Sequence, residues 1–386
     1  MLNFEFKNPT KIIFGKGEIS KIAAEIPKDQ KILITYGGGS IKKNGVYEQV
    51  MQALQGHEVL EFSGIEPNPT FETLSKAVTL VQKENVDFLL AVGGGSVLDG
   101  TKFIAAAACF EGDSWDLLAK QAPFEKALPL GAVLTLPATG SESNGGSVIT
   151  KKATQTKLPF GSPLLFPQFS VLDPTVTYSL PEQQISNGIV DAFVHVVEQY
   201  LTYPVNASIQ DRFAEGLLLT LIEEGPKALE NQEEPNYEVR ANLMWAATMA
   251  LNGLIGKGVP QDWATHMIGH ELTALHGIDH ARSIAIILPN MMQVRRTQKR
   301  AKLLQYAERV WNITTGDEEA IIDQAIQKTR EFFESVGVPT RLGDYGVKEQ
   351  DIPAIIEQLT NHRMVKLGEQ REVTPEVSRQ ILELSL

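Results

Sequence analysis

The amino-acid sequence predicts an α/β domain with a parallel sheet, followed by an all-α domain. Two observations predict this fold class. Up to about residue 178, short apolar runs alternate with amphipathic stretches, which is the pattern of βαβ units. Beyond that point nearly every segment has the period and the length of a helix. We therefore expect residues 1–178 to form the α/β domain and residues 179–386 to form the helical domain.

The apolar runs of the first half are the expected strands of the sheet. They read KILITY (31–36), DFLLAVGGG (87–95) and LGAVLTLP (130–137), and amphipathic stretches at 45–54 and 70–84 lie between the first two. Buried strands that alternate with helices are typical of a parallel sheet covered on both faces. In such sheets ligands bind at the carboxyl ends of the strands.

One segment of the first half has a different pattern. The stretch GGSVITKKATQTKLPFG (145–161) contains two short extended segments around a polar turn. This pattern predicts a β-hairpin outside the parallel sheet.

The helical half is expected to begin in the sequence SLPE. Ser179 and Glu182 have the spacing of a capping box, and the helix that they open should continue through residues 188–201. Glycine and proline mark the ends of several later segments. Further helices are expected at residues 212–225, 238–255, 301–311 and 318–337.

Composition limits the classes of function that the protein can have. The formal net charge is −12 and the sequence pI is about 5.2. An excess of acidic groups argues against nucleic acid or an anionic membrane as a partner, because either would need clustered Lys and Arg. A single cysteine, Cys109, excludes a disulfide within the chain, and its apolar surroundings predict a buried thiol. With no apolar signal segment or membrane span in the sequence, we expect a cytoplasmic protein.

The histidines indicate a metal site. Four of the seven fall within residues 266–280, HMIGHELTALHGIDH. Asp191 and His195 lie four residues apart on one expected helix, and His266 and His270 repeat that spacing on another. Gly277 should end the second helix, so that His280 can return alongside His266.

Imidazole nitrogens together with a carboxylate suit a divalent first-row metal such as Zn²⁺ or Fe²⁺. Spacing alone does not exclude His270 or His276 from the ligand set. The alternative is that these histidines cap helices and satisfy polar groups in the core, but four in so short a segment favour the metal site.

Two glycine-rich loops predict a phosphate site. ITYGGGSIKK includes Gly37, Gly38, Gly39 and Ser40, and AVGGGSVLDGTK includes Gly93, Gly94, Gly95, Ser96 and Asp99. Each loop follows an apolar strand, and neither is the GxGxxG fingerprint. Glycines let backbone N–H groups approach a phosphate, and a helix beginning near Val97 adds its positive end. The alternative is a tight strand-to-helix turn, but two such loops in one sheet favour a nucleotide.

The order of four motifs resembles the iron-containing alcohol dehydrogenase family. The motifs are GGGSVLDGTK, TLPATGSES, DAFVH and HMIGHELTALHGIDH, and the resemblance covers essentially the whole chain. Within the family the sequence is most similar to the NADP-dependent broad-range aldehyde reductases that are often named butanol dehydrogenases. The resemblance implies a Rossmann-like N-terminal domain that binds a dinucleotide, a helical domain that binds a metal, and an active-site cleft between them.

The resemblance also implies roles for individual residues. Its metal ligands fall on Asp191, His195, His266 and His280, and His270 matches a histidine near the nicotinamide that can relay a proton. His276 matches no functional position. Family contacts to the cofactor fall on Asn68, Thr135, Thr139, Asn144 and Lys157, beside the two glycine loops.

The first glycine loop predicts NADP(H) as the cofactor. Enzymes that prefer NAD usually place a carboxylate by the adenosine ribose, where it would repel a 2′-phosphate. The stretch YGGGSIKKNG has no Asp or Glu, and it offers the Ser40 hydroxyl with Lys42 and Lys43 nearby.

We therefore expect an alcohol dehydrogenase or aldehyde reductase that transfers hydride between NADP(H) and short-to-medium aliphatic aldehydes or primary alcohols. A divalent metal would polarise the carbonyl. Polyol oxidation of the glycerol dehydrogenase type is the main alternative, because those enzymes share a GGGS loop with a downstream Asp and Lys. A metal-dependent hydrolase would leave the glycine loops unexplained, and a non-catalytic scaffold would leave the intact ligands unexplained. The family also implies a homodimer.

Overall fold

The computed structural model describes residues 1–230 and 232–386, and the chain divides into two compact units. The sheet unit comprises Lys7–Pro181 and Glu233–Thr248. The helical unit comprises Met1–Phe6, Glu182–Gln232 and Met249–Leu386. Each unit therefore includes a short piece from the other half of the chain, and the boundary expected between residues 178 and 179 stays a prediction.

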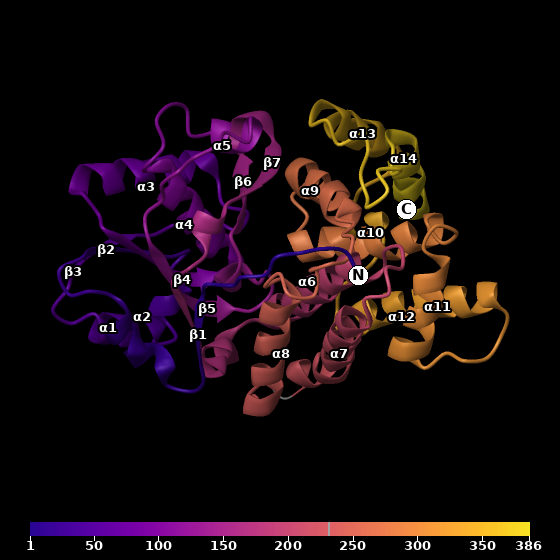
Figure 1. The fold of residues 1–386 in the computed structure, drawn as a ribbon, viewed down its shortest axis with the longest axis horizontal. Coiled ribbons are helices and arrows are strands. Elements are labelled where there is room, and N and C mark those ends of the chain that lie inside the picture. Colours follow the sequence, from indigo (N-terminus) through magenta and orange to yellow (C-terminus); the bar gives the residue numbers. More distant parts are fainter. Residues whose placement is uncertain (231) are drawn as a thin grey trace. The chain divides into compact units, whose positions relative to one another are not determined.

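A six-stranded parallel sheet forms the centre of the sheet unit (Figure 1). The strand order is β1-β8-β5-β4-β2-β3, and every neighbouring pair is parallel. The predicted α/β class with a parallel sheet is confirmed. The strands are β1 (Lys11–Phe14), β2 (Lys31–Thr35), β3 (Glu58–Phe62), β4 (Phe88–Gly94), β5 (Leu130–Leu136) and β8 (Phe169–Leu172).

Both faces of the sheet are covered, because side chains alternate along each strand. On β2, Ile32 and Ile34 pack into one hydrophobic cluster and Leu33 packs into another. Figure 1 shows α3 and α4 on one side of the strands and α1 and α2 on the other. The helices of this unit are α1 (Ile22–Glu25), α2 (Val46–Ala53), α3 (Phe71–Glu84), α4 (Gly95–Ala107), α5 (Asp116–Ala119) and most of α8 (Tyr237–Ala250).

The predicted hairpin is present outside the main sheet. Strands β6 (Gly146–Lys151) and β7 (Thr156–Gly161) pair antiparallel as a separate two-stranded sheet. They place the polar residues of the 141–157 region beside the start of α4.

The second unit is helical, as predicted. Its central helix is α6 (Glu182–Tyr200), which contacts α7 and α10 and is buried almost all round from Ile185 onward. A helix with no exposed face carries its polar side chains into the interior, where they need partners. The other helices are α7 (Ser208–Glu224), α9 (Ala264–His276), α10 (His280–Val294), α11 (Arg300–Trp311), α12 (Glu318–Ser335), α13 (Ile352–Asn361) and α14 (Pro375–Leu384).

Two local predictions are wrong. Ser179 does not cap α6, because Pro181 directly precedes the first helical residue and Ser179 ends a short 3₁₀ helix that begins at Pro174. Cys109 is exposed, because the chain leaves α4 two residues before it. The residues around Cys109 are apolar, but their burial inside the helix does not extend past its end.

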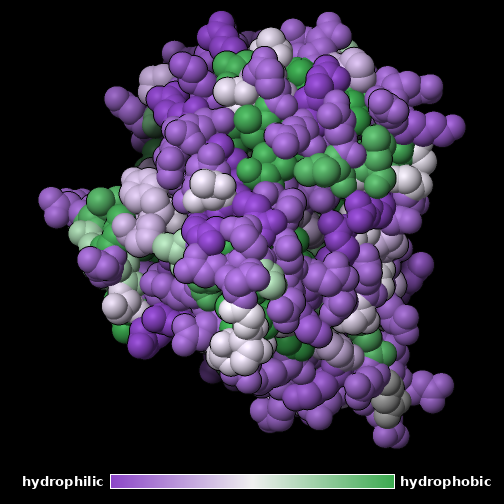
Figure 2. Space-filling model, turned by 90° about the vertical axis from the view of Figure 1, so that its right-hand side faces the viewer, coloured by the Kyte–Doolittle hydropathy of each residue, from purple (hydrophilic) through white to green (hydrophobic). Residues whose placement is uncertain are grey.

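One face of the molecule can be described by the hydropathy of its residues. The face in Figure 2 is mostly hydrophilic, and hydrophobic side chains gather mainly in a band across its upper part. Among the residues that the structure describes, no helix combines the length and the apolar character that crossing a bilayer requires.

Candidate functional site

Helix α6 presents the first two residues of the candidate metal centre. Asp191 and His195 lie one turn apart, and both are buried, with relative exposures of 2% and 4%. A carboxylate at this depth is unfavourable unless charged or hydrogen-bonding groups compensate it. The surroundings of Asp191 therefore determine what the site can do.

Helix α9 and the turn after it supply the remaining histidines. His266 and His270 are buried on α9, which ends at Gly277 in the left-handed conformation (φ 68°). The chain then reverses, so that His280 is the first residue of α10. This turn is what the spacing of the histidines predicted.

Asp279 fixes this turn against α6. Its Oδ2 atom accepts hydrogen bonds from the side-chain amides of Gln183 at 2.8 Å and Asn187 at 3.2 Å. Both donors lie on α6, Asn187 one turn and Gln183 two turns before Asp191. The two bonds therefore hold the start of α10 beside the helix that carries the carboxylate.

Three imidazoles converge on one carboxylate oxygen. The distances from Asp191 Oδ1 to the Nε2 atoms of His195, His280 and His266 are 3.5, 3.6 and 3.9 Å. One ligand atom from each of Asp191, His266 and His280 lies within 4.8 Å of the other two. A tetrahedral first-row ion with bonds of about 2.1 Å would hold its ligand atoms about 3.4 Å apart.

The chemistry of these atoms fits a cation. Asp191 Oδ1 and His266 Nε2 are buried and make no hydrogen bond. Burial acts to raise the pKa of Asp191, but the charges of His195, His280 and His266 hold that pKa well below its usual range. An ionised carboxylate and imidazole nitrogens are the donor set that Zn²⁺ and Fe²⁺ bind.

His195, His270 and His276 lie at different distances from this cluster. The ring of His195 stacks on that of His266, with centroids 4.7 Å apart, so His195 belongs to the cluster. His270 lies beside it, 5.2 Å from the ring of His280 and 6.3 Å from that of His266. His276 is exposed at the end of α9.

Glu198 is a residue of this site that the sequence analysis missed. It is buried on α6, and one carboxylate oxygen contacts Nδ1 of His266. Burial acts to lower the pKa of His266, but Glu198 and Asp191 raise it to about 9. The signal was available, because residues 191, 195 and 198 share one face of a helix.

The first glycine loop joins β2 to a short 3₁₀ helix at Ser40–Lys42. Gly39 has φ 93°, a conformation that favours glycine. A Cβ atom on Gly37 would lie 3.2 Å from the carbonyl oxygen of Ile65. Gly37, Gly38 and Ser40 thus lie at the carboxyl end of a parallel strand, where such folds bind ligands.

The second glycine loop is the direct junction of β4 and α4. Gly94 ends the strand and Gly95 begins the helix, two residues earlier than the expected start near Val97. A Cβ atom on Gly95 would lie 2.5 Å from the side chain of Thr139. The free N–H groups at the start of α4 form a positive end that suits a phosphate.

Three of the predicted cofactor residues form one cluster. The backbone N–H of Asn68 donates to Oγ of Ser96 at 3.3 Å, and Nζ of Lys157 donates to the side-chain Oδ1 of Asn68 at 2.8 Å. Asn68 has φ 55°. Segments that are distant in sequence thus bring Lys157 to the start of α4.

The other predicted cofactor residues lie around the same helix. Asp99 accepts hydrogen bonds from Ser141 Oγ at 2.7 Å and from the N–H of Val148 at 2.9 Å. Nζ of Lys102 donates to Ser141 Oγ at 2.8 Å and to Oδ1 of Asn144 at 3.1 Å. Asp99 and Asn144 therefore help to hold the hairpin against α4. Thr135 lies on β5, near its carboxyl end.

Lys42 of the first loop is less available to a phosphate than the sequence indicated. Nζ of Lys42 donates to Glu61 on β3 at 3.1 Å and lies 4.4 Å from the ring of Tyr47. The hydroxyl of Tyr36 also donates to Glu61, at 2.8 Å. The stretch itself has no Asp or Glu, but Glu61 approaches it from outside, because β3 lies next to β2 in the sheet.

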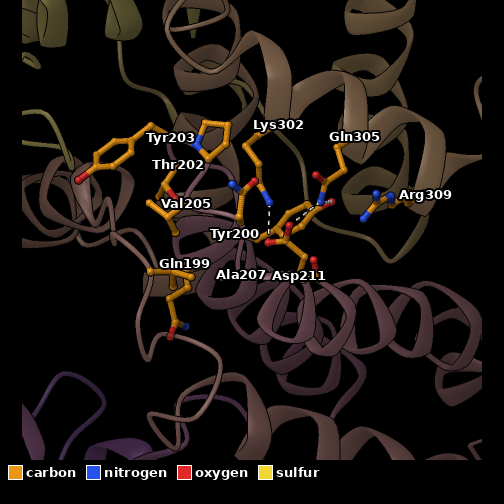
Figure 3. A pocket seen from close by; sticks show the side chains of 14 residues that line it. Gln199, Tyr200, Thr202, Tyr203, Val205, Ala207, Asp211, Lys302, Gln305 and Arg309 are labelled. Atoms are coloured by element: carbon orange, nitrogen blue, oxygen red, sulfur yellow. Dashed lines mark hydrogen bonds and ion pairs between the residues drawn. The ribbon is translucent and has the colours of Figure 1, made fainter. Parts of the chain in front are cut away.

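A pocket of about 180 Å³ lies in the helical unit, between the end of α6, the start of α7, and α11 (Figure 3). Its charged groups are already paired. Lys302 donates to Asp211 at 2.7 Å, and Arg309 donates to Glu215 at 3.1 Å. Gln305 bonds to both carboxylates, so this pocket offers no uncompensated charge to a ligand.

Comparison with known proteins identifies the family. A model of the iron-containing alcohol dehydrogenases matches residues 9–174, and a model described as Fe-containing alcohol dehydrogenase family, C-terminal, matches residues 185–385. The chain belongs to the iron-containing alcohol dehydrogenase family. The resemblance predicted from the motifs is confirmed.

Individual relatives are similar over nearly their whole length. The NADPH-dependent aldehyde reductase YqhD of Escherichia coli is 61% identical over 386 residues, covering 99% of each chain. The NADH-dependent butanol dehydrogenase A of Clostridium acetobutylicum is 39% identical over 381 residues, covering 97% of each. A crystal structure of E. coli YqhD matches with a TM-score of 0.98 at 60% identity, covering 100% of this chain and 99% of the other.

Proposed function

We propose that this protein is an NADPH-dependent aldehyde reductase that uses one divalent metal ion, Zn²⁺ or Fe²⁺. Its substrates are short-to-medium aliphatic aldehydes, and primary alcohols in the reverse direction. The observation that carries the proposal is the convergence of His195, His266 and His280 on Asp191 in a member of this dehydrogenase family.

Asp191, His195, His266 and His280 would hold the metal. When bound, a divalent ion acts as a Lewis acid that polarises a carbonyl. The buried carboxylate of Asp191 supplies negative charge, and Asp279 keeps the start of α10 in place. His270 lies beside the cluster, and in this proposal it would pass a proton to the product oxygen.

The sheet unit would bind the cofactor. The pyrophosphate fits the start of α4, where Gly94, Gly95 and Ser96 leave the backbone accessible. Asn68 and Lys157, which are hydrogen-bonded to each other, lie beside this point and add a positive charge. Thr135, Thr139, Asp99 and Asn144 would line or support the same site.

The preference for NADPH over NADH rests on the first glycine loop. The two relatives named above differ in cofactor, so family membership alone does not decide the preference. Gly37, Gly38, Gly39 and Ser40 carry no carboxylate, so the loop itself does not repel a 2′-phosphate. Lys42 is paired with Glu61, whereas Lys43 pairs with no carboxylate among the residues that the structure describes.

The test is the oxidation of NADPH with butanal, followed by the absorbance of the reduced nicotinamide. One sample is treated with a chelator, and Zn²⁺ or Fe²⁺ is then restored. We expect turnover to stop on stripping, to return with metal, and to be slower with NADH. Metal-loaded protein that reduced no aldehyde but oxidised glycerol would contradict the proposal in favour of the polyol alternative. Size measurement in solution would test the expected homodimer.

A further inference from the structure

Glu198 is almost fully buried beside the cluster of Asp191 and the histidines, with a relative exposure of 2%. One carboxylate oxygen accepts the backbone N–H of Thr265 at 2.7 Å, and the other contacts Nδ1 of His266. Its backbone carbonyl accepts the N–H of Asp262 at 2.9 Å. Three contacts therefore join one residue of α6 to the first turn of α9 and the segment before it.

We infer that Glu198 is a positioning residue for the metal, which fixes His266 with Nε2 toward the ion and balances the ion's second positive charge. This inference rests on the proposed metal site. It goes beyond the four expected ligands, because Glu198 is not expected to bind the metal itself.

The geometry supports the first part of the claim. An imidazole that binds a metal through Nε2 must carry its proton on Nδ1, and a carboxylate that accepts this proton fixes both the tautomer and the orientation of the ring. The Nδ1 atom of His266 faces Glu198, and its Nε2 atom, which makes no hydrogen bond, faces Asp191.

The charges support the second part. Neutral imidazoles and Asp191 together bring a single negative charge to a divalent ion, and a buried site with a net charge is unfavourable. Asp262 is also buried nearby, but its carboxylate is occupied by Lys299 Nζ at 2.7 Å and by the N–H of Ala264 at 3.0 Å. The carboxylate of Glu198, in contrast, contacts Nδ1 of the expected ligand His266.

The substitution Glu198→Gln tests the claim with almost no change in shape. If the glutamine oxygen keeps the bond to Thr265 N–H, its NH₂ group faces Nδ1 of His266 and drives the ring's proton onto Nε2. If the amide turns over, the NH₂ group faces the N–H of Thr265. The first orientation leaves a proton on the nitrogen that must bind the metal, the second sets one donor against another, and in both the charge is lost.

Glu271→Gln is the matched control. Glu271 is buried on α9 and is hydrogen-bonded to Nδ1 of another histidine, His362, at 2.7 Å. The same unit therefore has a second buried glutamate paired with a histidine, but His362 is not among the expected ligands. A general cost of removing a buried carboxylate would affect both variants alike.

The measurement is the Zn²⁺ affinity of stripped protein in competition with a chromophoric chelator, together with the melting temperature of each metal-free variant. We expect Glu198→Gln to bind Zn²⁺ about 10- to 100-fold more weakly than the wild type. Glu271→Gln should bind it like the wild type. At saturating Zn²⁺, the KM for NADPH of Glu198→Gln should be unchanged.

Wild-type affinity in Glu198→Gln would overturn the inference, and so would an equal loss in Glu271→Gln. If Glu198→Gln does not fold, Glu198→Asp replaces it, because Asp keeps the charge but withdraws it from Nδ1. Wild-type Zn²⁺ affinity in that variant would equally overturn the inference. A wild-type protein that binds no divalent metal would overturn the proposed function, and this inference with it.

Discussion

The Nε2 atom of His280 lies 3.6 Å from Oδ1 of Asp191, although the two residues belong to different helices. His195 and His266 approach the same oxygen atom. We therefore expect Asp191→Asn to lose the bound metal, because the amide carries no charge. Metal content per chain should fall to near zero and aldehyde reduction by more than about 100-fold, since even indirect metal contacts are worth about 10- to 100-fold.

The control for this experiment is Asp323→Asn, which removes an exposed carboxylate that pairs with Arg296 on the surface. It should retain metal and activity. Full metal occupancy and full turnover in Asp191→Asn would show that the ligand assignment is wrong.

His270 provides a different prediction, because it lies beside the cluster and the resemblance assigns it a proton-relay role. His270→Ala should keep its metal but lose turnover, with kcat falling on the order of 100-fold, as expected for a general acid. Metal analysis and steady-state kinetics on the same preparation separate the two effects. Loss of metal together with kcat would place His270 among the ligands instead.

Glu61 should weaken the preference for NADPH, because its carboxylate engages Lys42 at the carboxyl end of the strand next to the first glycine loop. Glu61→Gln removes a negative charge and frees the lysine. If the repulsion between the Glu61 carboxylate and the 2′-phosphate of NADPH is worth about 1 kcal/mol, its removal should raise the ratio of kcat/KM for NADPH over NADH about fivefold. The control is Glu58→Gln at the start of the same strand, where the carboxylate pairs with Lys31. An unchanged ratio in Glu61→Gln would remove Glu61 from the cofactor choice.

Gly95 and Gly216 should respond to alanine in opposite ways. At Gly95 the added Cβ would overlap Thr139, so Gly95→Ala should disturb the start of α4 and raise the KM for NADPH by about 10-fold, while metal content stays normal. At Gly216, exposed within α7, the Cβ would meet nothing within 4 Å. Gly216→Ala should therefore stabilise the protein by about 0.5–1 kcal/mol in urea unfolding. A normal KM in Gly95→Ala would argue against a phosphate at this turn.

Lys102 should make stability depend on pH in the alkaline range. Burial lowers its pKa to about 8, although Asp99 and Glu142 act in the opposite direction. Between pH 8 and the ordinary value of 10.5, the unfolded chain binds a proton that the folded chain has released. Raising the pH through this range therefore favours folding, by up to about 1.4 kcal/mol per pH unit.

The comparison that isolates this effect is wild type against Lys102→Met. The difference in free energy of unfolding between the two proteins should grow in favour of the wild type from pH 8 to pH 9.5. Urea midpoints at several pH values measure it. A constant difference would mean that Lys102 keeps its proton in the folded protein.

Local pattern was sufficient for the fold class and for the kinds of residue in the site. Strand and helix periods predicted the parallel sheet, the hairpin and the helical half, because these periods depend on residues within one or two turns of each other. The four-residue spacing of Asp191 with His195 likewise required only that α6 be a helix. The family motifs then indicated His280 as a ligand, and the structure brings it to Asp191.

The remaining features depended on residues that meet only in the folded chain. Spacing left His270 and His276 open as ligands, whereas in the structure His276 is exposed at the end of α9 and His270 lies beside the cluster. Glu61 reached Lys42 because β3 pairs with β2, a neighbour relation that composition does not record.

The sequence by itself determined the two classes of structure, the glycine loops and the donor types of a metal site, because each is encoded in short-range pattern and residue chemistry. Only the tertiary structure decided which side chains compensate the buried charges. Glu198 contacts His266 on another helix, and Lys299 occupies Asp262, so the charge balance of the centre depends on distances between helices. Coulomb energies in a buried site vary with those distances, and no local pattern specifies them.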